Sequence, residues 1–227
     1  MCGRFTIVSD MVAYQLEFDI HMDEKVKHDW KARYNVSPSQ PIPVVQDPLT
    51  RTIETMQWGL IPVWAKGDKA NTRLINVRAE TIMEKATFRK LMQQGQRCLI
   101  LADGFYEWKS SDQRGKSKIP HYFHLKNGKP FVFAGLWDKS GNAEQEVIST
   151  CAIITCSPNG LVSPIHNRMP VIFDSRTAWD WLKQEQLAEL LPLLKPYPEE
   201  SMMTYPVSTM INNPSADDPV CINLVQR

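Results

Sequence analysis

The stretch HYFHLKNGKPFVFAGL, residues 121–136, is the strongest indication of the fold in this chain. Two apolar, aromatic-rich runs at 121–125 and 130–136 flank the segment Lys126-Asn127-Gly128-Lys129. An Asn-Gly pair between two such runs is typical of a tight β-hairpin, because both residues tolerate the positive φ angles that the turn requires. The stretch therefore predicts two antiparallel strands joined by a turn at 126–129.

Further strand-like segments lie on both sides of this stretch. Residues 33–45 are expected to be extended, because the prolines spaced through them exclude a helix interior. The other predicted strands are apolar or alternating runs at 97–102, 147–155, 171–173, 201–208 and 220–225.

Three segments predict helices. The first covers residues 9–20, with Ser9 as a plausible N-cap. Its apolar positions are Met11, Val12, Leu16 and Phe18. The second opens with the capping-box pattern Thr81-Ile82-Met83-Glu84, runs through Met92 and stops at Gly95. Residues 177–194 are predicted to be helical in part, with Pro192 interrupting the end.

The order of these elements predicts the fold class. Because strands mostly follow one another without helical crossovers, we expect an α+β protein with a mostly antiparallel β core and peripheral helices. No linker or composition break divides the chain, so residues 1–227 are expected to form one domain. Residues 109–120 are rich in Ser, Asp, Gly and Lys and predict a solvent loop.

Composition and charge limit the class of protein. A hydrophobic content of 43% and a charged content of 22% are typical of globular proteins. No apolar run reaches the length of a membrane span and no signal peptide opens the chain, so we expect a cytoplasmic protein. The net charge of +1 argues against a histone-like polybasic binder, although a local basic groove for nucleic acid is compatible with it.

The five cysteines indicate buried thiols rather than disulfides. Their number is odd, none belongs to a CxxC pair, and Cys98, Cys151 and Cys156 lie in apolar runs. His121 and His124 are three residues apart, but no nearby Cys or carboxylate completes a ligand set. We therefore predict no metal and no cofactor.

The chain begins Met1-Cys2-Gly3-Arg4, which suggests chemistry at the N-terminus. If Met1 is removed, Cys2 carries a free α-amine beside its thiol. An α-amine has a pKa of about 7.7–8.0, so far more of it is unprotonated at neutral pH than of a Lys amine. The amine can attack an aldehyde, and the neighbouring thiol can then close a thiazolidine ring. The alternative is an ordinary buried Cys with Met1 retained, and position 2 by itself favours this alternative.

Three segments place an Arg two positions after a polar or reactive residue: Cys2 and Arg4, Asn76 and Arg78, His166 and Arg168. In an extended backbone, residues i and i+2 point to the same face, roughly 6.6 Å apart. Each segment could thus present one functional group beside a guanidinium whose planar donors suit phosphate oxygens. Such spacings also arise by chance in a chain of this composition.

Glu107 lies in the aromatic segment Gly104-Phe105-Tyr106-Glu107-Trp108. Aromatic surroundings raise the pKa of a carboxyl, so Glu107 could donate a proton near neutral pH. A strand-end Glu paired with Lys109 or another cation is an equally good interpretation. His166 is either a second acid/base group or a structural histidine, and Asn76 could position a substrate or the nucleophile.

The tryptophans divide between burial and nucleic-acid contact. For Trp58, burial is favoured. For Trp64, burial and stacking on a base are equally compatible with the sequence. The remaining tryptophans considered, expected in the core or on helix faces, are Trp30, Trp137, Trp179 and Trp181.

Taken together, these segments resemble the SOS response-associated peptidase (SRAP) family of abasic-site-processing proteins. The resemblance spans essentially the whole chain, and the segments stand in the family's order. They are MCGRF at 1–5, RYNVSPSQ at 33–40, WGLIPVW at 58–64, INVRAE at 75–80, ADGFYEW at 102–108 and HNRMPV at 166–171. The resemblance implies a barrel-like SRAP fold.

The resemblance also implies a role for each matching residue. Cys2 would be the nucleophile after self-removal of Met1, Asn76 and His166 would be sensing residues, and Glu107 would be the acid/base. DNA-binding positions would be Arg4, Asn35, Pro38, Trp64, Arg78 and Arg168. The implied activity is capture of abasic sites in single-stranded DNA as a covalent crosslink, by a monomer that associates with the nucleoid when DNA is damaged, with possible lyase-type chemistry.

Two other functions remain open at this point. An N-terminal-nucleophile peptidase or amidohydrolase would use the same Cys2 to attack a carbonyl group. A single-strand binder without chemistry would use the arginines alone. Activity on an unrelated peptide would favour the peptidase, and loss of the complex under denaturing conditions would favour the binder.

Overall fold

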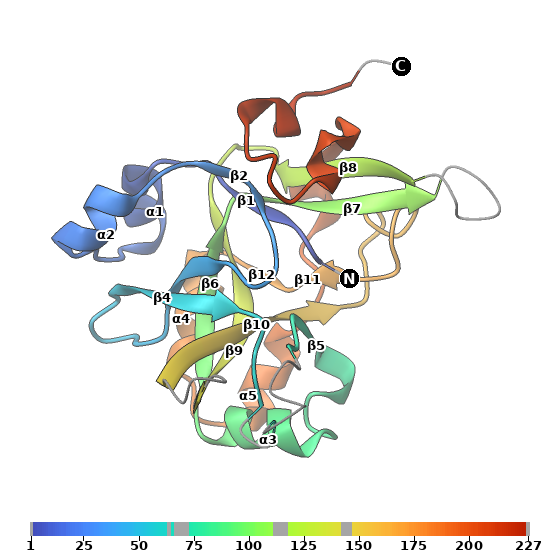
Figure 1. Cartoon of the computed structure of the whole chain (residues 1–227). Helices are drawn as coiled ribbons and strands as arrows, with labels where there is room; N and C mark the ends of the chain where they lie inside the picture. The colour runs from blue at the N-terminus through green and yellow to red at the C-terminus, as the bar shows by residue number, and fades with distance from the viewer. Residues whose placement is uncertain (1, 63–64, 66–72, 111–117, 142–146, 226–227) are drawn as a thin grey trace.

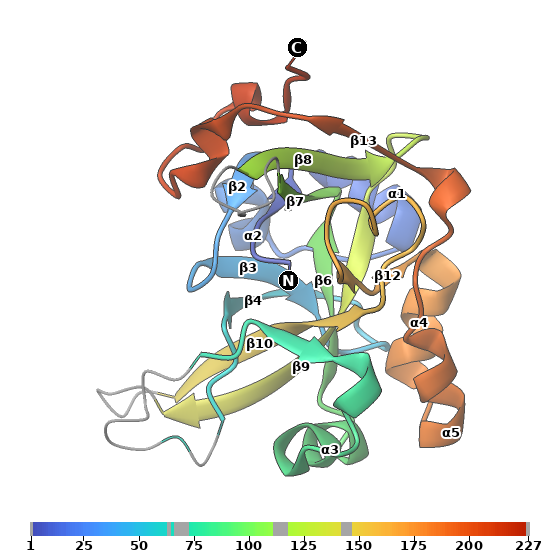
Figure 2. The ribbon, with the colours of Figure 1, turned by 90° about the vertical axis from the view of Figure 1, so that its right-hand side faces the viewer.

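The computed structural model describes residues 2–62, 65, 73–110, 118–141 and 147–225. Its strands form two sheets, one above the other in both ribbon views (Figures 1 and 2). The segment that leads into the first strand lies between the two sheets. This placement brings the N-terminal part of the chain into the interior.

The upper sheet has five strands, and every pairing within it is antiparallel. In spatial order they are β13 (Met202–Pro206), β8 (Lys118–Leu125), β7 (Gly104–Ser110), β1 (Phe5–Ile7) and β2 (Arg33–Val36).

The lower sheet closes into a barrel, because β10 pairs with β4 along one edge and with β9 along the other. The strands of this ring are β10 (Val147–Cys156), β4 (Ile53–Trp58), β3 (Pro41–Val45), β6 (Arg97–Ala102) and β9 (Phe131–Gly141). Three short strands extend it: β5 (Asn76–Arg78), β11 (Met169–Pro170) and β12 (Ile172–Phe173). The pairings of β4 and β5 with β10 are parallel, whereas the other described pairings between these strands are antiparallel.

Helices lie around the outside of the sheets (Figure 1). They are α1 (Met11–Phe18), α2 (Glu24–Asp29), α3 (Ala86–Gln93), α4 (Ser175–Lys183) and α5 (Leu187–Leu190). Short 3-10 turns are η2 (Ala79–Thr81), η3 (Leu191–Leu193), η4 (Glu199–Ser201), η5 (Thr209–Asn212) and η6 (Pro219–Ile222). The predicted α+β class with a mostly antiparallel core and peripheral helices is confirmed.

The predicted hairpin at 121–136 is wrong, although both of its strands exist. β8 pairs with β7 and β13, whereas β9 pairs with β6, β10 and β12. The turn therefore carries the chain from one sheet to the other, with Gly128 at a φ of 68°. The burial patterns give the reason: β8 alternates between buried and partly exposed positions, while residues 131–136 of β9 are buried throughout. The two strands need different environments.

Two helix boundaries also differ from the prediction. The first helix begins at Met11, because the Asp10 side chain, not Ser9, accepts a hydrogen bond from the Ala13 N–H at 2.8 Å. Val12 and Leu16 are exposed on it, and Tyr14 and Phe18 are buried. The second begins at Ala86 rather than at the predicted capping box, which lies in η2 and the following turn.

The remaining segments agree in part with the expectations. The buried strand at 97–102 and the extended stretch at 33–45 are confirmed. The predicted strand at 220–225 is wrong, because η6 covers Pro219–Ile222. The predicted loop at 109–120 is shorter, since β7 reaches Ser110 and β8 begins at Lys118; residues 111–117 lie outside the described residues.

A buried carboxyl fixes β1 at the turn between β6 and β7. Asp103 accepts hydrogen bonds from Thr6 Oγ1 at 2.5 Å, from the Val8 N–H at 2.6 Å and from the Ser9 N–H at 2.5 Å. The next residue is glycine by necessity, since a Cβ at Gly104 would stand 2.2 Å from the Tyr122 hydroxyl. These contacts hold β1, and hence the residues before it, against β7.

All five cysteines are free and buried, as predicted for Cys98, Cys151 and Cys156. Within the described part of the chain, no group of three or more His, Cys, Asp or Glu residues could hold a metal ion. The described helices are too short or too polar to cross a membrane.

Candidate active site between the two sheets

Four of the predicted site residues converge between the two sheets. Cys2 precedes β1, Asn76 begins β5, Glu107 lies in the middle of β7, and His166 lies in the loop before β11. The Asn76 Nδ2 donates to the Cys2 carbonyl at 2.9 Å, and His166 Nε2 lies 3.7 Å from Glu107 Oε2. Glu107 is near enough to Cys2 to influence its thiol electrostatically. Tertiary structure thus gathers groups that are far apart in sequence.

Cys2 is fully buried, with an exposed fraction of 0%. Burial first, and then the nearby Glu107 carboxylate, raises the pKa of its thiol well above the usual range. Its Sγ lies 3.9 Å from the Arg4 carbonyl. The thiol is therefore protonated at neutral pH and is a weak nucleophile by itself.

Glu107 is 2% exposed and lies in mid-strand rather than at a strand end. Burial raises the pKa of its carboxyl from 4.5 to about 7. A carboxyl with this pKa is protonated in a large fraction of molecules at neutral pH, as a general acid requires.

His166 is partly buried, and burial is the main cause that lowers the pKa of its imidazole. Its Nδ1 lies 3.0 Å from the Arg168 backbone nitrogen and 3.1 Å from the Arg168 carbonyl oxygen. A neutral imidazole at this position can accept or donate a proton near Glu107.

The three arginines differ in their surroundings. Arg78 is exposed at the end of β5. Arg4 is partly buried, and its Nη1 donates to Asn35 Oδ1 at 2.8 Å and to the Ile211 carbonyl at 2.6 Å. Arg168 forms a two-bond ion pair with Glu80, at 2.7 and 2.8 Å. Asn76 and Arg78 lie in a strand, as the spacing argument assumes, whereas residues 2–4 and 166–168 lie outside the strands.

The other predicted DNA-binding residues differ in how far they are exposed to solvent. Asn35 is 1% exposed, and its Nδ2 donates to the carbonyls of Ile211, Asn213 and Ala216, so its side chain faces the interior. Pro38 is partly buried in the turn between β2 and β3. Trp64 lies outside the described residues. Trp58 is buried, as favoured from the sequence.

Two buried polar atoms of the predicted site residues are left without a partner in the described part of the chain. Neither Asn76 Oδ1 nor Arg168 Nε has a hydrogen-bond partner among the described residues. Buried polar groups are normally hydrogen-bonded, so such atoms call for an explanation. An acceptor and a donor left in this way are suited to a polar ligand between the sheets.

Sequence reasoning missed two contributors, Glu80 and the C-terminal segment around Ile211. Glu80 stands at the end of the INVRAE motif, two residues after Arg78, and that position is a signal that could have been used. Nothing in the sequence around Ile211 indicates a contact with Arg4, which is 207 residues away.

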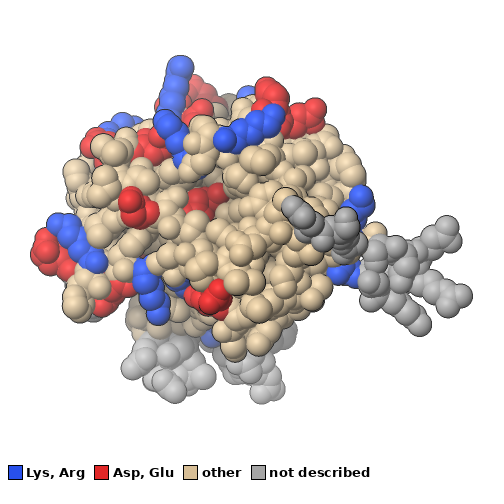
Figure 3. All heavy atoms as spheres, turned by 90° about the horizontal axis from the view of Figure 1, so that it is seen from above, with Lys and Arg blue, Asp and Glu red and all other residues tan. Residues whose placement is uncertain are grey.

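Charge on the face above β7 and β8 is mixed. Figure 3 shows Lys and Arg side chains interspersed with Asp and Glu, with a largely uncharged area between them. Among the described residues, this face therefore presents no continuous basic patch, in keeping with the net charge of +1.

Comparisons with known proteins match most of the chain. A family model described as SOS response associated peptidase (SRAP) matches residues 1–214. The abasic site processing protein YoqW of Bacillus subtilis is 42% identical over 227 residues, covering 98% of this chain and 99% of YoqW. The abasic site processing protein HMCES of Gallus gallus is 31% identical over 231 residues, covering 85% of this chain and 66% of HMCES.

A solved structure shows the same fold. The crystal structure of a protein from Bacteroides thetaiotaomicron matches with a TM-score of 0.86 at 27% identity. The match covers 99% of this chain and 100% of that chain.

Proposed function

The chain belongs to the SRAP family, and we propose that it captures abasic sites in single-stranded DNA as a covalent crosslink through Cys2. The observation that carries this proposal is the convergence of Cys2, Asn76, Glu107 and His166 between the sheets. The naming of YoqW and HMCES as abasic site processing proteins supports the choice of substrate.

The first step is removal of Met1. The nitrogen of Cys2 is part of a peptide bond until hydrolysis of that bond releases methionine and leaves a free α-amine on Cys2. We assign this step to the protein itself. Glu107 and His166 are the acid/base groups near this bond.

The second step opens the sugar. An abasic deoxyribose is mostly a closed ring, and opening to the aldehyde requires a proton on the ring oxygen. Protonated Glu107 supplies this proton, for which its pKa of about 7 is suited. Asn76 and Arg168 Nε can hold polar groups of the substrate while the ring opens.

The third step forms the crosslink. The Cys2 amine attacks the aldehyde carbon, and loss of one water gives an imine. The Cys2 thiol then adds to the imine carbon and its proton passes to the nitrogen, which closes the thiazolidine ring. Because the buried thiol is protonated, it is a weak nucleophile, and the amine is expected to attack first. For the same reason, peptide hydrolysis by a Cys2 thiolate is disfavoured.

An abasic single-stranded oligonucleotide tests the proposal directly. After incubation, we expect a complex that survives a denaturing gel, with an intact mass equal to the protein without Met1 plus the oligonucleotide minus one water. Cys2→Ser keeps the amine but lacks the thiol, so it should give only an imine that borohydride traps. The control Cys221→Ser loses a buried thiol in the separate cluster around Tyr106 and should still form the stable adduct.

Two results would contradict the proposal. A heat-stable adduct from Cys2→Ser without reduction would exclude the thiazolidine. A parent protein that retains Met1, or a complex that dissociates on the gel, would exclude crosslinking through the Cys2 amine.

A further inference from the structure

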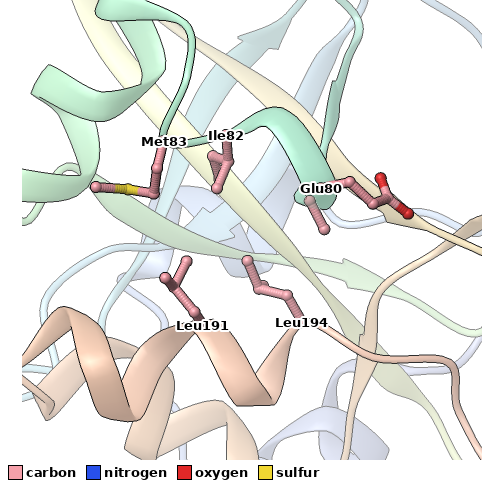
Figure 4. Close-up of a pocket in the computed structure, with 6 residues that line it drawn as sticks. Glu80, Ile82, Met83, Leu191 and Leu194 are labelled. Carbon is pink, nitrogen blue, oxygen red and sulfur yellow. The ribbon is translucent and has the colours of Figure 1, made fainter.

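Glu80 borders a small cavity lined mainly by apolar residues, but its carboxylate does not point into the cavity. The cavity has a volume of about 300 Å³ and is lined by Ala79, Glu80, Ile82, Met83, Leu191 and Leu194. Figure 4 shows the Glu80 carboxylate directed away from the apolar side chains. The carboxylate instead forms an ion pair with Arg168.

Glu80 and Thr155 hold the Arg168 side chain at several points. The guanidinium donates from Nη1 and Nη2 to the two Glu80 oxygens at 2.7 and 2.8 Å, and from Nη2 to the Thr155 carbonyl at 2.6 Å. Two parallel charge-assisted bonds restrict a guanidinium in both position and orientation. The Arg168 bonds keep the pKa of Glu80 at about 2, so the carboxylate is ionised at neutral pH.

The main chain of Arg168 in turn supports His166. The Arg168 N–H can donate to an unprotonated Nδ1 at 3.0 Å, and the Arg168 carbonyl can accept from a protonated Nδ1 at 3.1 Å. The imidazole thus keeps a partner for Nδ1 whichever nitrogen carries the proton. Its other nitrogen stays directed at Glu107, 3.7 Å away.

We propose that Glu80 is a positioning residue: by fixing Arg168 against β10, it holds the main chain that orients the His166 imidazole toward Glu107. The catalytic consequence rests on the proposed function, whereas the orientation of His166 does not.

The orientation is tested on the free protein by NMR. The side-chain ¹⁵N and ¹³C signals of His166 are compared between the parent, Glu80→Ala and Glu80→Gln. We expect Glu80→Ala to move the His166 signals toward those of the exposed His28, with Glu80→Gln intermediate because its amide keeps the shape and one acceptor. Signals of His21, His28 and His124 should not move, which would show that the fold is intact.

The catalytic consequence is tested with an abasic oligonucleotide at saturating concentration, so that affinity does not enter. Glu80→Ala should lower the crosslinking rate by up to about 10²-fold, the scale of a displacement of about 1 Å in a catalytic group. Glu80→Gln should recover part of the rate. The matched control is Glu84→Gln, which removes the same charge from an exposed position four residues on and should keep the parent rate.

Unchanged His166 signals in Glu80→Ala would overturn the proposal. A faster rate with tighter DNA binding would also overturn it, because Glu80 would then compete with phosphate for Arg168. If Glu80→Ala does not fold, the isosteric Glu80→Gln alone tests the proposal, through its His166 signals and its crosslinking rate. Failure of the parent itself to crosslink would count against the proposed function and leave the NMR comparison intact as the test of Glu80.

Discussion

At the scale of single residues, burial of Glu107 disfavours its ionised carboxylate but suits its proposed role as a proton donor. Its carboxyl is 2% exposed and therefore loses the hydration that stabilises the charged form. The pKa of about 7 that results is unfavourable for an ordinary structural carboxylate, but it suits a group that must donate a proton near neutral pH. Strongly shifted pKa values of this kind are concentrated at functional sites.

Glu107→Gln should slow crosslinking by about 10²–10⁴-fold, the usual contribution of a general acid. The protonated fraction of Glu107 decreases as the pH rises through about 7, whereas the reactive fraction of the Cys2 amine increases. The parent rate should therefore pass through a maximum near neutral pH. In Glu107→Gln the rate should rise with pH without the descending limb, as measured by quenched gel assays from pH 5 to 9.

A simple open-chain aldehyde separates the acid role from a structural one, because it does not need the ring-opening proton. It should react with Glu107→Gln nearly as fast as with the parent. Glu54→Gln, at an exposed carboxylate on β4, is the control with unchanged kinetics. Equal defects toward the aldehyde and the oligonucleotide would withdraw the general-acid role.

At the scale of elements, β5 sorts its three side chains to different places. It runs parallel to β10, with Asn76 opposite Ile153 and Arg78 opposite Thr155. Asn76 reaches Cys2, Val77 is buried, and Arg78 is exposed. One short strand thus brings an amide into contact with Cys2 and exposes a cation two residues later.

Arg78→Ala should weaken binding to single-stranded DNA of any sequence, since contacts to the phosphate backbone carry no sequence information. The slope of log affinity against log salt should decrease by about 0.7, the value for one phosphate contact on a single strand. Fluorescence anisotropy at several salt concentrations with an intact oligonucleotide measures both quantities. Arg89→Ala, which removes an exposed charge on α3, is the control. A parent-like slope in Arg78→Ala would exclude the proposed contact.

At the scale of the whole molecule, the C-terminal segment is joined to the N-terminal residues. Asn35 accepts from Arg4 and donates to three carbonyls between Ile211 and Ala216, and Asp217 accepts from the Asn35 N–H at 3.0 Å. The segment lies across the upper sheet in both ribbon views (Figures 1 and 2). The segment around Ile211 therefore meets the N-terminal residues at Arg4.

Asn35→Ala should release this segment. Removing the buried Asn35 amide leaves its carbonyl acceptors without a donor, which costs about 1–3 kcal/mol. The free energy of unfolding should decrease by that amount. Limited proteolysis followed by mass spectrometry should show the first cuts within residues 209–225. Affinity for single-stranded DNA should also fall, because Arg4 loses one of its two acceptors.

Asn212→Ala provides the comparison within the same segment. Its side chain accepts only an exposed hydrogen bond from Trp108 Nε1 among the described contacts, so its loss should change little. If Asn35→Ala is as resistant to protease as the parent, the segment is held by its apolar contacts and not by Asn35.

The sequence determined the local properties of this protein. Apolar runs such as 97–102 were buried strands, the prolines of 33–45 kept that stretch extended, and the lone cysteines were buried thiols. Motifs in family order identified the SRAP family and its candidate residues. These features depend on residues that are close together in the chain, so they can be predicted from the sequence.

Only the tertiary structure decided which strands pair and which side chains meet. The turn at 126–129 satisfied the local chemistry of a hairpin, yet β8 and β9 entered different sheets because their faces needed different degrees of burial. Glu80 pairs with Arg168, which is 88 positions away in the chain. Arg4 contacts Ile211, which is 207 positions away. Such contacts depend on how whole elements pack, because local periodicity carries no information about which distant surface will cover a given side chain.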